Sequence, residues 1–149
     1  MATDQLTDQE KDILLRLARE SMEAAVRQEK VPEIDLENMP HRLQAEGASF
    51  VTLTIQGALR GCIGALEPRK ALALDVSEHA IAAALHDFRF PQVAPDELSR
   101  IKIEVSRLTL PAPLEYQGPE DLLTRLRPGI DGVTLRDEGR RATFLPQVW

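Results

Sequence analysis

The sequence predicts an α+β fold in which helices flank a mainly antiparallel sheet. Two segments carry apolar residues at helical spacing, one near the amino terminus and one over residues 70 to 86. Three further stretches show the alternation or turn chemistry of strands. Tight turns join two of the predicted strand pairs, which is the connection used by antiparallel strands.

The first predicted helix begins at a capping box, Thr7-Asp8-Gln9-Glu10, in which the threonine side chain accepts a bond from a free backbone amide while the glutamate reaches back. We expect Val31-Pro32 to end this helix, because proline disfavours helical geometry in the preceding residue. The second predicted helix carries small and apolar residues on one face: Leu72, Val76, Ala80, Ala83 and Ala84.

The strand predictions rest on period-two alternation. Residues 49 to 55 alternate in this way, and Gln56-Gly57 can then turn the chain so that residues 58 to 63 return as a partner. Residues 101 to 106 form the clearest half-buried strand. The remaining expected elements are an irregular connection or short turn-rich segment over 32 to 47, a fixed loop after Asp87, a short helix over 119 to 126, and a closing hairpin of 133 to 136 with 142 to 145.

Composition excludes several classes of protein. The 149 residues include 18 basic and 24 acidic side chains, so the net charge of −6 provides no broad cationic field for non-specific nucleic-acid binding. A single cysteine forms no internal disulfide, and no apolar run approaches the roughly 20 residues that cross a bilayer. The amino terminus lacks the pattern of a secretory signal, so we expect a cytoplasmic protein with no membrane partner.

The strongest candidate site surrounds Cys62, which stands in Leu59-Arg60-Gly61-Cys62-Ile63-Gly64. The flanking glycines permit a sharp bend and the close approach of another group, and Arg60 can hold an anion or favour a thiolate. We therefore predict Cys62 and Arg60 as catalytic residues, with Gly61 and Gly64 at a ligand. Two other interpretations remain open: a small buried structural residue, and, least favoured for want of partner ligands, a metal ligand.

Three charged residues are further candidates for ligand binding. Arg89 offers a planar fork for a carboxylate or phosphate, and Asp87 can fix its orientation. The alternative is a structural ion pair that anchors the loop. Glu104 lies on the polar face of its strand, where a role at a ligand and simple exposure are equally consistent. His79 and His86 lie too far apart to hold one ion and are expected to be solvated or capping, so we predict no metal site.

The chain resembles the AMMECR1 family over roughly residues 45 to 149, and several separated motifs in one order carry this resemblance. The matching stretches are Leu59 to Gly64, Asp87-Phe88-Arg89-Phe90-Pro91-Gln92-Val93, Glu97-Leu98, Ile103-Glu104-Val105-Ser106, Gly129-Ile130-Asp131-Gly132-Val133 and Ala142-Thr143-Phe144-Leu145-Pro146-Gln147-Val148.

The resemblance implies one cytosolic domain over residues 1 to 149, with a larger and a smaller subdomain and with the cysteine segment near the cleft between them. In this family the chain normally continues past the last motif, so the usual carboxy-terminal portion is expected to be missing here. Relatives often accompany Memo-like and radical S-adenosylmethionine proteins, as in the AmmeMemoRadiSam system, which implies a place in a modification pathway. The resemblance implies no settled activity and identifies no cofactor.

Two functions follow as hypotheses. The first is a cleft enzyme or ligand-binding protein that uses the Leu59 to Gly64 segment on a small polar or anionic ligand, with Cys62 attacking an electrophilic centre. The second is a non-catalytic protein interaction module in which the same segment is a structural turn.

Overall fold

A computed structural model describes residues 5–146 of the chain. The chain divides into two compact units, the first ending at Leu110 and the second beginning at Pro111. Gln147 and Val148, the end of the last family motif, lie outside the described residues. No helix within residues 5–146 is long and apolar enough to span a membrane.

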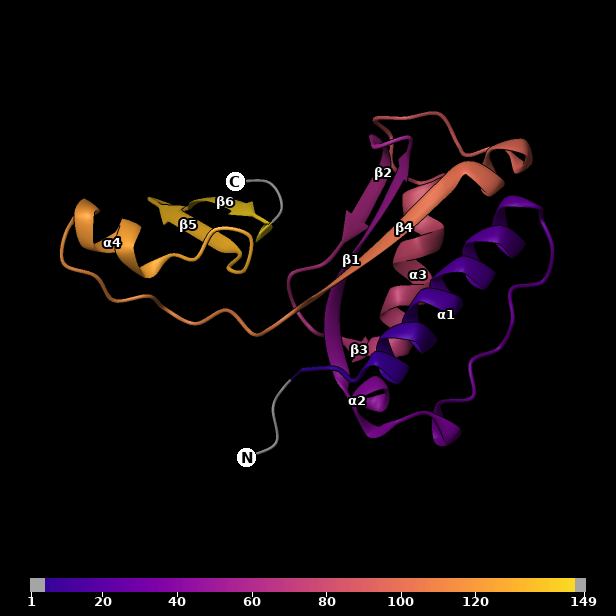
Figure 1. Ribbon diagram of the computed structural model, residues 1–149, viewed down its shortest axis with the longest axis horizontal. Helices are drawn as coiled ribbons and strands as arrows, with labels where there is room; N and C mark the ends of the chain where they lie inside the picture. Colours follow the sequence, from indigo (N-terminus) through magenta and orange to yellow (C-terminus); the bar gives the residue numbers. More distant parts are fainter. Residues whose placement is uncertain (1–4, 147–149) are drawn as a thin grey trace. The chain divides into compact units, whose positions relative to one another are not determined.

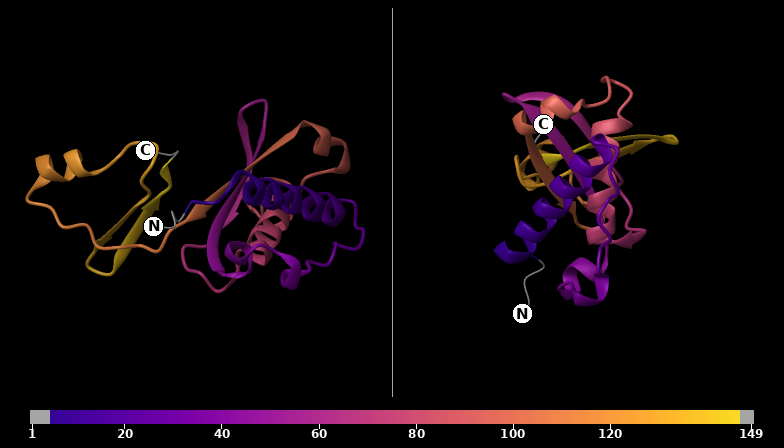
Figure 2. Two further views of the ribbon diagram at one scale, coloured as in Figure 1. Left: turned by 60° about the horizontal axis from the view of Figure 1, so that its bottom comes forward. Right: turned by 90° about the vertical axis from the view of Figure 1, so that its right-hand side faces the viewer.

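The first unit packs two long helices on one face of an antiparallel sheet (Figures 1 and 2). Strand β1 is central, with β2 on one side and β4 on the other, while β3 pairs with the beginning of β1. This arrangement confirms the predicted class, an α+β fold with an antiparallel sheet flanked by helices. In chain order the elements are α1 (Asp8–Val26), a 3-10 turn (Leu36–Asn38), α2 (His41–Gln44), β1 (Glu46–Ile55), β2 (Ala58–Gly64), β3 (Lys70–Ala71), α3 (Leu72–Leu85), a second 3-10 turn (Pro95–Arg100) and β4 (Ile101–Leu108).

Helix α1 begins as the sequence predicts and ends earlier. The Thr7 Oγ1 atom accepts a bond from the Glu10 amide at 3.2 Å, and the Glu10 carboxylate accepts one from the Thr7 amide at 2.8 Å. The helix ends at Val26 rather than at Val31-Pro32, because Gln28 adopts a left-handed conformation with φ of 57°. That conformation cannot continue a right-handed helix.

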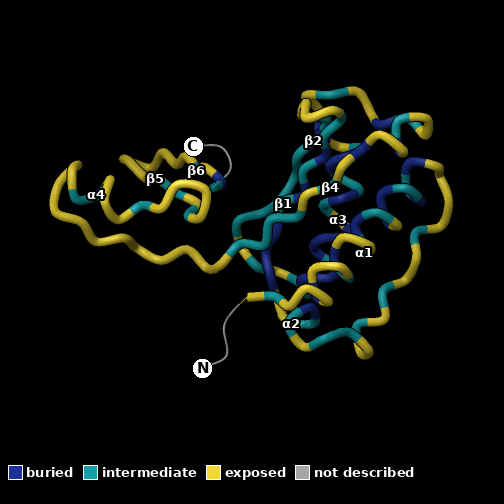
Figure 3. The backbone as a smooth tube through the Cα atoms, in the orientation of Figure 1, coloured by how far each residue is buried: buried dark blue, intermediate teal, exposed yellow. Residues whose placement is uncertain are grey.

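The core lies between the helices and the sheet (Figure 3). On β1 the side chains of Ser49, Val51 and Leu53 are buried toward the helices. The alternate residues, among them Thr52, therefore point to the opposite face of the sheet. We call this opposite face, with Thr52 and its cross-strand neighbours Cys62 and Glu104, the open face.

The second unit contains helix α4 (Pro119–Arg125) and a hairpin of β5 (Val133–Asp137) and β6 (Arg140–Phe144). The hairpin turns at Glu138 and Gly139, both with positive φ. Large apolar side chains on these elements are exposed, including Leu123 and Leu135. All seven residues predicted as catalytic or ligand-binding belong to the first unit.

Candidate functional site

A β-bulge decides where Arg60 points. Gly61 pairs with Leu53 and Leu59 pairs with Thr54, so Arg60 is an extra residue between two paired positions. A bulge of this kind redirects a side chain that a regular strand would hold on a fixed face.

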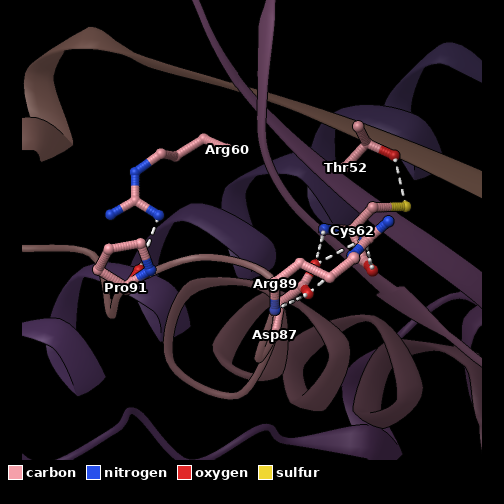
Figure 4. Close-up of polar contacts among 6 residues, drawn as sticks. All are labelled: Thr52, Arg60, Cys62, Asp87, Arg89 and Pro91. Atoms are coloured by element: carbon pink, nitrogen blue, oxygen red, sulfur yellow. Dashed lines mark hydrogen bonds and ion pairs between the residues drawn. The ribbon is translucent and has the colours of Figure 1, made fainter.

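The Arg60 guanidinium consequently lies apart from Cys62 (Figure 4). Its Nε and Nη2 atoms donate to the Glu97 carboxylate at 2.9 and 3.1 Å, and Nη1 donates to the Pro91 carbonyl at 2.8 Å. The same guanidinium holds the pKa of Glu97 below its ordinary value, with the Ala94 amide adding to the effect. The structure thus engages Arg60 in anchoring the loop after α3 and does not bring it to the thiol.

Gly61 and Gly64 are required by close packing. A Cβ atom on Gly61 would lie 2.1 Å from the Ala83 carbonyl oxygen of α3. A Cβ atom on Gly64 would lie 2.4 Å from both the Phe50 ring and the Ser49 carbonyl oxygen. These two glycines let β2 lie directly against α3 and β1 and so fix the strand that carries Cys62.

Asp87 and Arg89 form a clip on the outer edge of β2 (Figure 4). The buried Asp87 carboxylate accepts a bond from the Cys62 amide at 2.9 Å. Arg89 donates to both carboxylate oxygens of Asp87, at 3.0 and 2.7 Å, and to the Cys62 carbonyl at 3.3 Å. The clip therefore satisfies both backbone groups of Cys62 that face away from β1. It brings three of the predicted site residues, Cys62, Asp87 and Arg89, together.

The two charged side chains of the clip shift each other's pKa. The Arg89 side chain holds the pKa of Asp87 far below its ordinary range, the Cys62 and Arg89 amides add to this effect, and burial of the carboxyl opposes it. The same pair raises the pKa of Arg89. The Arg89 side chain is nevertheless 60% exposed, so the guanidinium keeps surface available for a second anion.

The Cys62 thiol lies on the open face and is half-buried. Its Sγ atom is 3.2 Å from Thr52 Oγ1, within hydrogen-bond distance. Thr52 also pairs with Glu104 across the other side of β1. Thiol, hydroxyl and carboxylate therefore stand in one row, with Cys62 and Glu104 about 10 Å apart given the usual strand spacing. Glu104 is exposed.

Thr52 carries no mark that identifies it in the sequence alone, and Glu97 is marked only as part of the Glu97-Leu98 stretch that resembles the family. Strand register makes Thr52 the partner of Cys62, and the fold of the loop makes Glu97 the partner of Arg60. Asp75 and His79, by contrast, are four residues apart on α3 and so predictable as neighbours. The His79 Nδ1 atom lies 3.1 Å from Asp75, whose carboxylate accepts a bond from Ser49 at 2.7 Å.

The expectation that His79 is solvated or capping is therefore wrong for this side chain, which is 15% exposed and bonded inside the fold. The buried Ser49 hydroxyl bonds Asp75 directly and lies 3.4 Å from His79 Nδ1, the same nitrogen that Asp75 contacts. A hydrolase triad places serine and aspartate on opposite nitrogens of the ring, so this group does not form one. Within residues 5–146, no group of three or more histidine, cysteine, aspartate or glutamate side chains is placed to hold a metal ion.

Comparison with known proteins gives one consistent relationship. The AMMECR1 family model matches residues 15–149. A protein of Methanothermobacter thermautotrophicus is 42% identical over 135 residues, which cover 91% of this chain and 70% of the relative. A protein of Thermotoga maritima is 41% identical over 130 residues, which cover 85% of this chain and 71% of the relative. The crystal structure of the uncharacterized protein PH0010 from Pyrococcus horikoshii superposes with a TM-score of 0.85 at 33% identity, over 96% of this chain and 72% of that one.

Proposed function

Because the chain belongs to the AMMECR1 family, whose model covers most of its length without supplying an activity, we propose a function from the site itself. The protein binds a small polar or anionic ligand on the open face of the sheet, where Cys62 acts as a nucleophile. The observation that carries this proposal is the half-buried Cys62 thiol, 3.2 Å from the Thr52 hydroxyl, with its backbone held by Asp87 and Arg89.

The roles follow from the contacts. A cysteine attacks an electrophilic carbon best as a thiolate, and a nearby cation favours that form. Arg89 is the cation bonded to the Cys62 backbone, whereas Arg60 is bonded to Glu97, so Arg89 takes the anion-binding role first expected of Arg60. Thr52 is placed to exchange a hydrogen bond with the sulfur, and Glu104 ends the row on the opposite strand.

Thiol labelling tests this proposal. Cys62 is the single cysteine, so iodoacetamide reports on it without interference. We expect the folded protein to be labelled faster at pH 7 than free cysteine, and Arg89→Gln to slow the reaction several-fold. Arg60→Gln is the matched control, because it removes a guanidinium from the same region without touching Cys62. A folded protein that is labelled no faster than free cysteine, or with equal loss in both variants, contradicts the proposal.

A second candidate function is favoured by Phe88. This side chain is 97% exposed although both of its neighbours are held in the clip on β2. A large apolar side chain presented on a fixed loop suits a protein interaction module. The Memo-like and radical S-adenosylmethionine proteins implied by family resemblance, in a cytoplasmic setting, are the partners to test. Loss of their binding in Phe88→Ser but not in Cys62→Ser would favour this function over nucleophilic chemistry.

A further inference from the structure

The two edges of the sheet in the first unit differ in what they leave available. At β2, the clip of Asp87 and Arg89 occupies the outward backbone groups of Cys62. Strand β4 pairs with β1 over all eight of its residues without a register shift, and no strand in the described part of the chain lies on its other side. β4 also contains no proline, the residue that cannot donate to a strand ladder.

The direction of the outward groups on β4 follows from two independent contacts. Arg19 of α1 donates to the Ile101 carbonyl at 2.6 Å, so this carbonyl faces away from β1. On the other side of the sheet, the Cys62 amide faces outward from β2, so Cys62 and Thr52 form a non-hydrogen-bonded pair. The next residue of β1, Leu53, therefore directs its backbone groups toward β2 and away from Ile103, its partner on β4. Both lines of evidence place the amides and carbonyls of Ile103 and Val105 on the outer edge of β4.

A hollow lies beside this edge. It measures about 360 Å³ between α1 and β4, and its lining includes Leu15, Arg19 and Ile103. Leu15 is a large apolar side chain that is 41% exposed. A strand added along β4 would gain backbone hydrogen bonds and would cover Leu15, which is how strand addition to a free edge is stabilised.

We infer that a second copy of this chain occupies the edge, with the two β4 strands paired antiparallel about a two-fold axis at Ile103. In this register Lys102 of each copy stands opposite Glu104 of the other on the open face. These positions form a non-hydrogen-bonded pair, in which side chains approach most closely, because Ile103 and Val105 carry the outward backbone groups. Opposite charges at such a pair stabilise it, whereas like charges oppose it.

The neighbouring registers are disfavoured by the same side chains. Shifting the register by one pair in one direction places Lys102 opposite Lys102 of the other copy. Shifting it in the other direction places Glu104 opposite Glu104 of the other copy. A further shift centres the pair on Val105 and draws in Ser106 and Arg107, which already make other interactions. The charges on β4 therefore favour the register centred on Ile103 over the two adjacent registers, in a symmetric arrangement of the kind that an isologous interface requires.

Sedimentation equilibrium of the full chain tests the inference, with circular dichroism to verify that each variant is folded. We expect a concentration-dependent dimer in the wild type. Lys102→Glu and Glu104→Lys each place like charges opposite one another, and each should weaken the dimer about tenfold or more, the effect of about 1.4 kcal/mol. The double variant exchanges the charges and should restore the dimer, and an equimolar mixture of the two single variants should form mixed dimers.

Lys30→Glu is the matched control, because it makes the same change of charge at a side chain that is 85% exposed and belongs to neither α1 nor β4. It should leave the dimer intact. A wild type that stays monomeric at all concentrations overturns the inference, as does a dimer that the single variants do not weaken or that the double variant does not restore. The Cys62 labelling experiment reads the reactivity of the thiol rather than the pairing of β4, so either result can fail without the other.

Discussion

Replacing Gly61 with alanine should destabilise the first unit much more than the same change at a glycine with open surroundings, such as Gly57. The added Cβ would lie 2.1 Å from the Ala83 carbonyl oxygen, about 1.3 Å short of the 3.4 Å at which ordinary contact begins. The obstacle is helix backbone, which cannot rotate away as a side chain does. Either β2 or the end of α3 must move by about an ångström, and both are held by the Asp87 bond to the Cys62 amide.

The expected cost is about 3 kcal/mol or more, at the upper end of the range for overpacked cores. Urea unfolding followed by far-UV circular dichroism measures it, because the long helices α1 and α3 both belong to the first unit. With a slope of about 2 kcal/mol per molar urea, the midpoint should fall by about 1.5 M.

Gly57→Ala is the matched control. Gly57 lies at the hairpin tip with φ of +80° and with nothing within 4 Å of an added Cβ, so alanine there should cost only about 1 kcal/mol of backbone strain. A Gly61→Ala variant that unfolds within about 0.5 kcal/mol of the wild type, or no earlier than Gly57→Ala, would show that β2 does not lie against α3 as described.

Three further outcomes are expected. Asp87→Asn should lower the free energy of unfolding at pH 7 by about 2 kcal/mol, as for the loss of charged hydrogen bonds. The pKa of Asp87 is depressed in the folded state, so the stability that its carboxylate contributes is present above the ordinary pKa of 3.8 and is lost as the pH falls below it. The acid-induced loss of stability should therefore be smaller in the variant. Arg60→Gln and Glu97→Gln should each cost about 1 to 2 kcal/mol, and a double-mutant cycle should show that the two losses are not additive. Phe88→Ser should leave the unfolding midpoint unchanged, since the side chain is 97% exposed.

Local pattern predicted most of the fold of the first unit. The capping box at Thr7 and the turn at Gln56-Gly57 are decided by neighbours in the sequence and lie where they were expected. The alternation also places β1 and β4, although β1 begins earlier, at Glu46, and β4 continues to Leu108. The end of α1 could not be predicted from Val31-Pro32, because a left-handed residue at Gln28 stops the helix first.

The candidate site was only partly predictable, and the bulge explains why. Side chains two residues apart share a face in a regular strand, so Arg60 was expected beside Cys62. The extra residue in the register removes that relation and sends Arg60 to Glu97. The pairing of Cys62 with Thr52 and the bond from its amide to Asp87 depend on register and on the path of the chain after α3. No local pattern encodes contacts of that kind.

The clip at Asp87 and Arg89 has a consequence for how far copies of this chain can join. A sheet with two available edges can add copies indefinitely and grow into a filament. In the described part of the first unit, Asp87 and Arg89 already bond the outward backbone groups at the middle of β2, so a strand of another copy cannot pair with those groups. Pairing of the two β4 strands would occupy this edge in both copies at once, so assembly would stop at a dimer.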